Sequence, residues 1–303
     1  MELNIKASFA FLLLFLARLS DARHQRRLKP PSLILPNMAH QVMEISSKNL
    51  SFNFLTNSTI QDITSQDSKL FHVNVNGCRN LTFIRVNITA PPESINTDGI
   101  HVARSSNVNI TDCVIGTGDD CISIGDELEQ LHITRVTCGP GHGISVGSLG
   151  KTPGEKPVVG VYVKNCTFIN TDNGVRVKTW PASHQGVVTD LHYEDIIVQN
   201  VTNPIVIDQV YCPYNQCNKD ISKVSIKNVR GTSRTQDAKS LLLCSKGVPC
   251  EGVEIGDIDI AYNGKEGPAK SRCENVKPTF VGKQNPPVCA LELDHRLSFT
   301  NLL

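Results

Sequence analysis

From about residue 45 onward, short apolar runs alternate with turns rich in Asn, Gly, Asp and Ser, and no convincing amphipathic helix interrupts them. Four-residue runs recur along this region at intervals of roughly 22 to 37 residues. Each run predicts a short strand. Their positions are residues 70–73, 99–102, 121–124, 143–146, 174–177, 204–207 and 240–243.

A second set of runs precedes these in each period and alternates apolar with polar side chains. The apolar positions suit one face of a sheet that points into a shared interior. Because one coil alone buries too little apolar surface, stacked coils are needed for a continuous core. The second set comprises residues 81–84, 108–110, 131–133, 161–163, 191–193, 224–226 and 253–255.

This pattern predicts an all-β fold, a right-handed parallel β-helix. A leucine-rich repeat is disfavoured because its Leu-x-x-Leu-x-Leu-x-x-Asn spacing is absent and the period varies too widely. A β-sandwich also contains short strands, but it does not hold equivalent strands in register over many periods.

The N-terminal residues differ from the repeat. In residues 1–22, Lys6 precedes an apolar run at residues 9–17, which is shorter than the roughly 20 residues of a membrane-spanning helix. This arrangement predicts a secretory signal peptide. Residues 23–44 are proline-containing and lack periodicity, so we expect an irregular lead-in. Residues 45–303 are then expected to form a single parallel β-helix domain.

The net charge and the glycosylation sequons limit the partners and the location that can be expected for the protein. The formal net charge is +1, so no global field recruits nucleic acid or a membrane, and an anionic partner must be held locally. We expect a secreted monomer. Sequons for N-glycosylation agree with secretion. They begin at Asn49, Asn57, Asn80, Asn87, Asn109, Asn165 and Asn200.

The chain has 11 cysteines, which in a secreted protein favour disulfides, and none has the spacing of a zinc site. An odd count leaves at least one thiol free. From residue 263 onward the period is lost, and a local cysteine pair there predicts a disulfide-stapled cap. The candidate pairs are Cys212/Cys217, Cys244/Cys250, Cys273/Cys289 and Cys121/Cys138. Three others border apolar strands and are expected to be buried thiols: Cys78, Cys113 and Cys166.

Charged residues recur at one position of successive periods. Asp98 comes just before its strand, Asp119 and Asp120 come just before the next strand, and His142 comes just before the one after that. Coils of a β-helix are about 4.8 Å apart, so these groups are expected at one edge of one sheet. Pro153, Gly154 and Pro157 lie in a longer excursion between periods, which is expected to wall a cleft.

Such a cluster suits glycoside hydrolysis, which needs one protonated carboxyl and one carboxylate. Like-charge repulsion among three acids raises at least one pKa. Arg176 and Lys178, two residues apart on the outward face of a later strand, suit a carboxylated sugar. Each residue alone is an ordinary turn or surface residue; their shared position in successive periods favours a site.

At these residues the chain resembles the polygalacturonase family of glycoside hydrolases, which act on pectin. Four signatures of that family occur in order: NTDG at residues 96–99, GDD at 118–120, GHG at 141–143, and Arg-x-Lys at 176–178. Further segments resemble plant, pollen-type exopolygalacturonases. The resemblance implies a right-handed parallel β-helix and inverting, exo-type hydrolysis of α-1,4-linked galacturonic acid without a metal or other cofactor.

The resemblance also implies a role for each residue of the acidic cluster. Asp119 would be the general acid, and Asp98 and Asp120 would position and deprotonate the water. His142 would hold the protonation and geometry of the acid.

Three further residues would bind substrate: Arg176 and Lys178 would hold uronate carboxylates, and Tyr211 matches a substrate-contacting tyrosine. Family members usually carry roughly a hundred more residues before this region. We therefore expect a chain that is N-terminally truncated relative to the family, with an exposed first coil.

Other functions remain open on the sequence. A truncated pectin-binding pseudoenzyme would bind without turnover. An endo-polygalacturonase or a rhamnogalacturonan hydrolase would use a similar site. A pectate lyase would act by calcium-dependent elimination and would need calcium-binding acids and an Arg base.

Overall fold

A computed structural model describes residues 3–6, 48–180, 184–209, 219–236, 240–262, 264–267 and 270–289. Every regular element among these residues is a β-strand. The predicted signal peptide and lead-in lie outside the described residues, apart from β1 (Leu3–Lys6), which pairs parallel with β3 (Thr56–Gln61). No helix of the described residues is long and apolar enough to cross a membrane.

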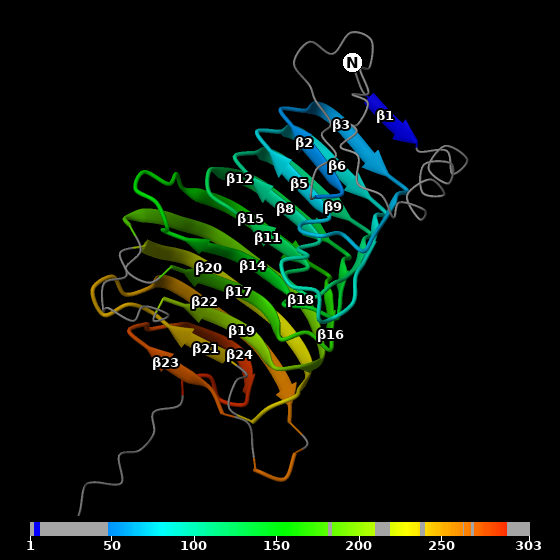
Figure 1. Cartoon of the computed structure of the whole chain (residues 1–303). Helices are drawn as coiled ribbons and strands as arrows, with labels where there is room; N and C mark the ends of the chain where they lie inside the picture. The colour runs from blue at the N-terminus through cyan, green and yellow to red at the C-terminus, as the bar shows by residue number, and fades with distance from the viewer. Residues whose placement is uncertain are drawn as a thin grey trace, which may run out of the picture.

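The strands wind into a parallel β-helix, which confirms the predicted fold class (Figure 1). One face is a nine-stranded sheet to which successive coils each contribute one strand, and all of its neighbouring strands are parallel. In sheet order these strands are β2 (Leu50–Asn53), β5 (Val73–Asn76), β8 (Ile100–Ala103), β11 (Ile122–Ile124), β14 (Ile144–Leu149), β17 (Asn173–Thr179), β19 (Asn203–Asp208), β21 (Ser240–Leu243) and β23 (Arg272–Glu274).

The other faces belong to a 15-stranded sheet, because the long strand β18 (Gly186–Val201) pairs with strands of both faces. Its remaining members after β1 and β3 are β4 (Thr64–Gln66), β6 (Arg79–Ile84), β7 (Asn87–Thr89), β9 (Ser106–Thr111), β10 (Val114–Gly116), β12 (Leu128–Thr134), β13 (Thr137–Cys138), β15 (Val158–Lys164), β16 (Thr167–Ile169), β20 (Lys219–Ser233), β22 (Glu251–Ala261) and β24 (Thr279–Asn285).

The register follows the apolar positions. Ile100, Ile122 and Ile144 lie opposite one another in the nine-stranded sheet, and all three side chains are buried in the common core. Polar side chains at the alternate positions point outward, as the period of two requires. The predicted alignment is confirmed for the whole second set and for residues 99–102, 121–124, 143–146, 174–177 and 204–207 of the first set. Residues 240–243 are shifted by one position, because Ser240 lies opposite Ile205 rather than Pro204.

The first member of the predicted set, residues 70–73, is wrong. The strand is β5, and Val73 rather than Phe71 lies opposite Ile100. Phe71 does not fill the core; its ring stacks on His101 with the centroids 4.8 Å apart. This apolar run belongs to the turn that leads into the strand, and only its last residue is part of the strand.

The disulfide predictions are confirmed for Cys121–Cys138, Cys244–Cys250 and Cys273–Cys289. The predicted thiols Cys78, Cys113 and Cys166 are free and buried. The candidate pair Cys212/Cys217 lies outside the described residues. The prediction that the period is lost from residue 263 onward is wrong, because β23 and β24 pair parallel with β21 and β22 and form a further coil. The bond between Cys273 and Cys289 joins β23 to the segment after β24, so a disulfide closes that coil.

Candidate active site

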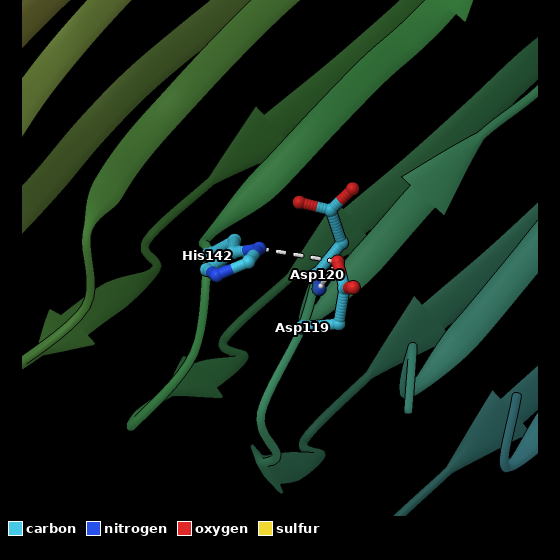
Figure 2. Close-up of side chains that lie close together, drawn as sticks. All are labelled: Asp119, Asp120 and His142. Carbon is cyan, nitrogen blue, oxygen red and sulfur yellow. Dashed lines mark hydrogen bonds and ion pairs between the residues drawn. The ribbon is translucent and has the colours of Figure 1, made fainter. Parts of the chain in front are cut away.

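The carboxylates and the histidine reach one edge of the nine-stranded sheet from successive coils. Asp98 lies just before β8, Asp119 and Asp120 lie just before β11, and His142 lies just before β14. Figure 2 shows Asp119, Asp120 and His142 as neighbours, with the His142 ring turned toward Asp119. The fold thus brings together the groups that the repeat spacing singles out.

Close backbone packing sets the position of these turns. A Cβ on Gly118 would lie 2.2 Å from the carbonyl oxygen of Ser94, so only glycine fits before the Asp doublet. Gly141, just before the histidine, has a φ of 129° and its Cβ would lie 2.5 Å from the carbonyl oxygen of Asp119. The GDD and GHG signatures therefore contain glycines for steric reasons as well as acids and a histidine for chemistry.

Asp120 is the centre of a buried ionic network. Arg176 Nη2 donates to Oδ1 at 2.8 Å, and Lys178 Nζ donates to Oδ2 at 3.1 Å. The Ser145 hydroxyl also donates to Oδ1, at 2.8 Å, and its oxygen accepts from Arg176 Nε at 2.9 Å. The Asp120 side chain is only 3% exposed. Breaking such a buried pair leaves an uncompensated charge, so each partner fixes the others.

Asp119 forms a separate pair with His142. Nδ1 of His142 lies 3.1 Å from Oδ1 of Asp119, and the backbone N–H of Asp120 donates to the same oxygen at 2.7 Å. The backbone N–H of Asn96 donates to Oδ2 at 3.2 Å. Both side chains are partly exposed. Asp119 can therefore reach a bound molecule while its orientation is fixed.

The contact between Asp119 and His142 shifts the pKa values of both groups. Burial alone would raise the pKa of Asp119, but the hydrogen bond from His142, the N–H of Asp120 and the nearby positive charges outweigh it, so the pKa is lowered. The hydrogen bond with Asp119 raises the pKa of His142, against the effect of burial. The two groups therefore share one proton that is retained above the ordinary histidine pKa.

Asp98 has the opposite character. Its side chain is almost fully buried, and that burial, reinforced by the charge of Asp120, raises its pKa from 3.8 to about 7. A hydrogen bond with Ser123 lowers the pKa only in part. The prediction that at least one carboxyl pKa of the cluster is raised therefore holds for Asp98 and not for Asp119. Desolvation contributes more to this rise than like-charge repulsion does.

Sequence reasoning missed three polar partners. Ser123 and Ser145 lie on the predicted outward face, but the pattern gives them no role. Asp172, whose Oδ2 lies 3.6 Å from Nε2 of His142, belongs to no recognised motif. The register with Arg176 could have revealed Ser145, since the two residues lie directly opposite each other. Nothing in the spacing points to Asp172. The predicted substrate residue Tyr211 lies outside the described residues.

Three side chains of the site lie close enough together to be considered as metal ligands. One ligand atom from each of Asp119, Asp120 and His142 lies within 4.8 Å of the others. Arg176 and Lys178 already compensate Asp120, and the shared proton occupies the Nδ1 side of His142. A divalent cation would have to displace these charges, so the donor set fits a metal poorly.

The fold places this protein among the parallel β-solenoids. The acid cluster and the two cations on one sheet give it a site suited to acid–base chemistry. The chain belongs to glycosyl hydrolases family 28, whose family model matches residues 37–285.

Several curated relatives share this region. A polygalacturonase of Nicotiana tabacum is 76% identical over 247 residues, which cover 80% of this chain and 62% of the relative. An exopolygalacturonase of Oenothera organensis is 56% identical over 250 residues, which cover 80% of this chain and 69% of the relative. The match thus spans about 62% of the length of the tobacco protein.

Solved structures share the fold. The polygalacturonase of Erwinia carotovora is 27% identical with a TM-score of 0.60, and the match covers 77% of this chain and 60% of that one. The endo-xylogalacturonan hydrolase of Aspergillus tubingensis is 22% identical with a TM-score of 0.64, covering 77% of this chain and 68% of that one. At that identity the second likeness concerns the fold alone.

Proposed function

We propose that this chain hydrolyses the α-1,4-glycosidic bonds of polygalacturonate, the acidic backbone of pectin. The observation that carries the proposal is the arrangement of three acids: Asp119 shares a proton with His142, Asp98 beside it has a raised pKa, and two cations contact Asp120. The names of the plant relatives, polygalacturonase and exopolygalacturonase, support the same substrate. Hydrolysis of a glycoside needs a proton donor and a base, and a uronate needs a counter-charge.

The Asp119–His142 pair is the proposed proton donor. In the substrate-free site the proton resides mainly on His142, because the pKa of Asp119 is lowered and that of His142 is raised. Transfer of this proton from Nδ1 to Oδ1, across 3.1 Å, leaves a neutral Asp119 and a neutral imidazole. Asp119 then gives the proton to the glycosidic oxygen as the bond to the leaving sugar breaks.

The proposed base is Asp98, with Asp120 orienting the water. The water attacks the anomeric carbon and its proton passes to a carboxylate, which must therefore be ionised. Since the pKa of Asp98 is raised to about 7, ionisation of this residue limits the reaction below that pH. Asp120, held by Arg176 and Lys178, is better suited to positioning than to accepting a proton.

Arg176 and Lys178 are the proposed contacts for uronate carboxylates. Their side chains remain 17% and 24% exposed, and each carries donors beyond those used by Asp120. Tyr211 is retained in the proposal on its resemblance alone. The signal peptide, if present as predicted, directs the protein to the cell exterior, where pectin is found.

Incubation of the folded chain with polygalacturonate tests the activity. We expect saturated products and new reducing ends, released without added calcium; unsaturated, calcium-dependent products would instead indicate a lyase. Early products that consist of monomer alone support exo action, as in the name of the Oenothera relative, whereas a ladder of oligomers indicates endo action. Saturable binding without any product would favour a pectin-binding pseudoenzyme.

The stereochemistry needs its own measurement. Inverting glycosidases usually hold their two carboxyl groups about 6.5–9.5 Å apart, whereas oxygens of Asp119 and Asp120 lie within 4.8 Å. The proposal pairs Asp119 as the acid with Asp98, which lies on the preceding coil, as the base. Proton NMR of the first product should show the β-anomer; an α-anomer would refute inversion.

A further inference from the structure

An exposed tryptophan extends the outward row of β17 beyond the two proposed substrate cations. Val177 and Thr179 are buried, and the alternate positions are Arg176, Lys178 and then Trp180. The indole of Trp180 is 39% exposed. Its backbone N–H donates to the carbonyl oxygen of Leu149 at 2.7 Å, so the position of the residue is fixed by β14.

A lysine from the neighbouring loop stands over this ring. Nζ of Lys151 lies 4.9 Å from the centroid of the Trp180 ring. The loop, residues 150–157, is held by Glu155, which accepts hydrogen bonds from the backbone N–H of Gly150 and of Thr152. The cation and the aromatic ring are therefore brought together by two anchored backbone segments, and the contact itself is a favourable cation–π interaction.

The charge of Lys151 differs from that of the cations in the site. Arg176 and Lys178 both contact Asp120, which offsets part of their charge. Within the described parts of the chain, no carboxylate lies within ion-pair distance of Lys151, whereas Lys156 in the same loop pairs with Glu127 at 2.7 Å. Lys151 thus presents a positive charge that has no ion-pair partner among the described residues, over one face of a partly exposed tryptophan.

We propose that Trp180 and Lys151 form an additional subsite for a galacturonate unit next to the one held by Arg176 and Lys178. The ring offers an apolar surface to the C–H face of a sugar, and the ammonium offers a counter-charge to its carboxylate. Two residues along a strand span about 6–7 Å, so the subsite takes a neighbouring unit of the same polymer. This inference rests on the proposed substrate, and it assigns chain-length preference to the loop at residues 150–157.

Four variants test the subsite. Lys151→Met removes the charge, Lys151→Arg keeps it, and Trp180→Ala removes the ring. Lys156→Met is the matched control, since it removes an equal charge from the same loop at a position already paired with Glu127. Calorimetric titration with monomeric galacturonate and with longer oligogalacturonates measures affinity, and product release is measured on the same samples.

We expect Lys151→Met to weaken the binding of longer oligogalacturonates about two- to fivefold, as for an exposed ion pair. We expect Trp180→Ala to weaken it about two- to tenfold. Binding of monomeric galacturonate and the affinity of Lys156→Met should match the wild type, and Lys151→Arg should restore most of the loss. Unchanged affinity in Lys151→Met and Trp180→Ala, or equal loss in Lys156→Met, would overturn the subsite.

The two proposals can fail separately. Wild-type protein that binds long oligogalacturonates through Lys151 without releasing product would refute hydrolysis and retain the subsite. Turnover by the wild type with no dependence on Lys151 or Trp180 would retain hydrolysis and refute the subsite. No binding of any oligogalacturonate would refute the subsite as well.

Discussion

Replacing Asp98 with asparagine should stabilise the protein at neutral pH while abolishing its activity. Burial raises the pKa of Asp98 from an unfolded value of 3.8 to about 7, so the folded state binds this proton more tightly than the unfolded chain does. Stability contributed by the protonated form is present below pH 4 and is lost as the pH rises to 7. The amide that the substitution introduces would have no such dependence, and it can still accept a hydrogen bond from Ser123.

The stabilisation expected for Asp98→Asn follows from the size of the pKa shift of Asp98. About three pKa units at 1.36 kcal/mol each correspond to roughly 4 kcal/mol, which is an upper bound for the relative stabilisation of Asp98→Asn at pH 8. At pH 4 the two proteins should differ little through this group. The difference in free energy of unfolding between variant and wild type should therefore grow steadily between pH 4 and pH 7.

Denaturant unfolding at several pH values measures this difference directly, because contributions from distant groups cancel between the two proteins. Asp112→Asn is a useful control of opposite sign, since the Asp112 carboxylate is exposed and the hydrogen bond with Arg135 lowers its pKa. That variant should lose stability slightly near neutral pH. A difference between wild type and Asp98→Asn that is constant from pH 4 to pH 8 would refute the assignment of a buried, protonated carboxyl.

Four further outcomes are expected. Asp119→Asn should abolish turnover and leave oligogalacturonate binding nearly unchanged, as calorimetry and product assays can show, because it removes the proton donor with little change of shape. Arg176→Ala should lower both affinity and rate and should also destabilise the fold by about 1.5–3 kcal/mol in denaturant unfolding, since it removes one charged hydrogen bond to Asp120 while Lys178 remains. Activity should be insensitive to EDTA, because arginine and lysine already compensate Asp120; loss of activity that calcium or zinc restores would contradict this. The value of kcat/KM should rise with pH toward 7 as Asp98 ionises; a value that rises as the pH falls below 7 would assign proton donation to Asp98.

The fold was largely predictable from sequence because a β-helix repeats one structural unit. Leu81, Val108, Leu131 and Val161 occupy equivalent positions in successive coils, and the structure pairs them in that register. The error at residues 70–73 has a physical cause, since hydrophobicity alone does not distinguish a core residue from an aromatic residue that stacks outside, as Phe71 does on His101. Turn geometry decides that position, and the local pattern does not contain it.

The composition of the site was predictable for the same reason, but its charge states were not. Equal spacing brings Asp98, Asp119 and His142 to one sheet edge whatever their chemistry. Which acid keeps its proton depends on burial and on individual hydrogen bonds, which differ between neighbouring turns. Asp98 faces a buried serine, whereas Asp119 receives two backbone N–H groups and a histidine. Spacing in a sequence does not carry these differences.

Asp98 and Asp119 differ in protonation, and this difference depends on the position of Arg176 and Lys178. If Asp120 were unpaired, its charge would raise the pKa of Asp98 further and would also raise the pKa of His142 further, since it acts on both groups. The charge of Asp120 is instead compensated by Arg176 and Lys178, and its carboxylate also accepts a hydrogen bond from Ser145. The two cations therefore act on the pKa values of the neighbouring acids even without a bound substrate. Substitutions there should alter the pH dependence of kcat/KM as well as substrate affinity, a combined change that simple loss of a substrate contact would not produce.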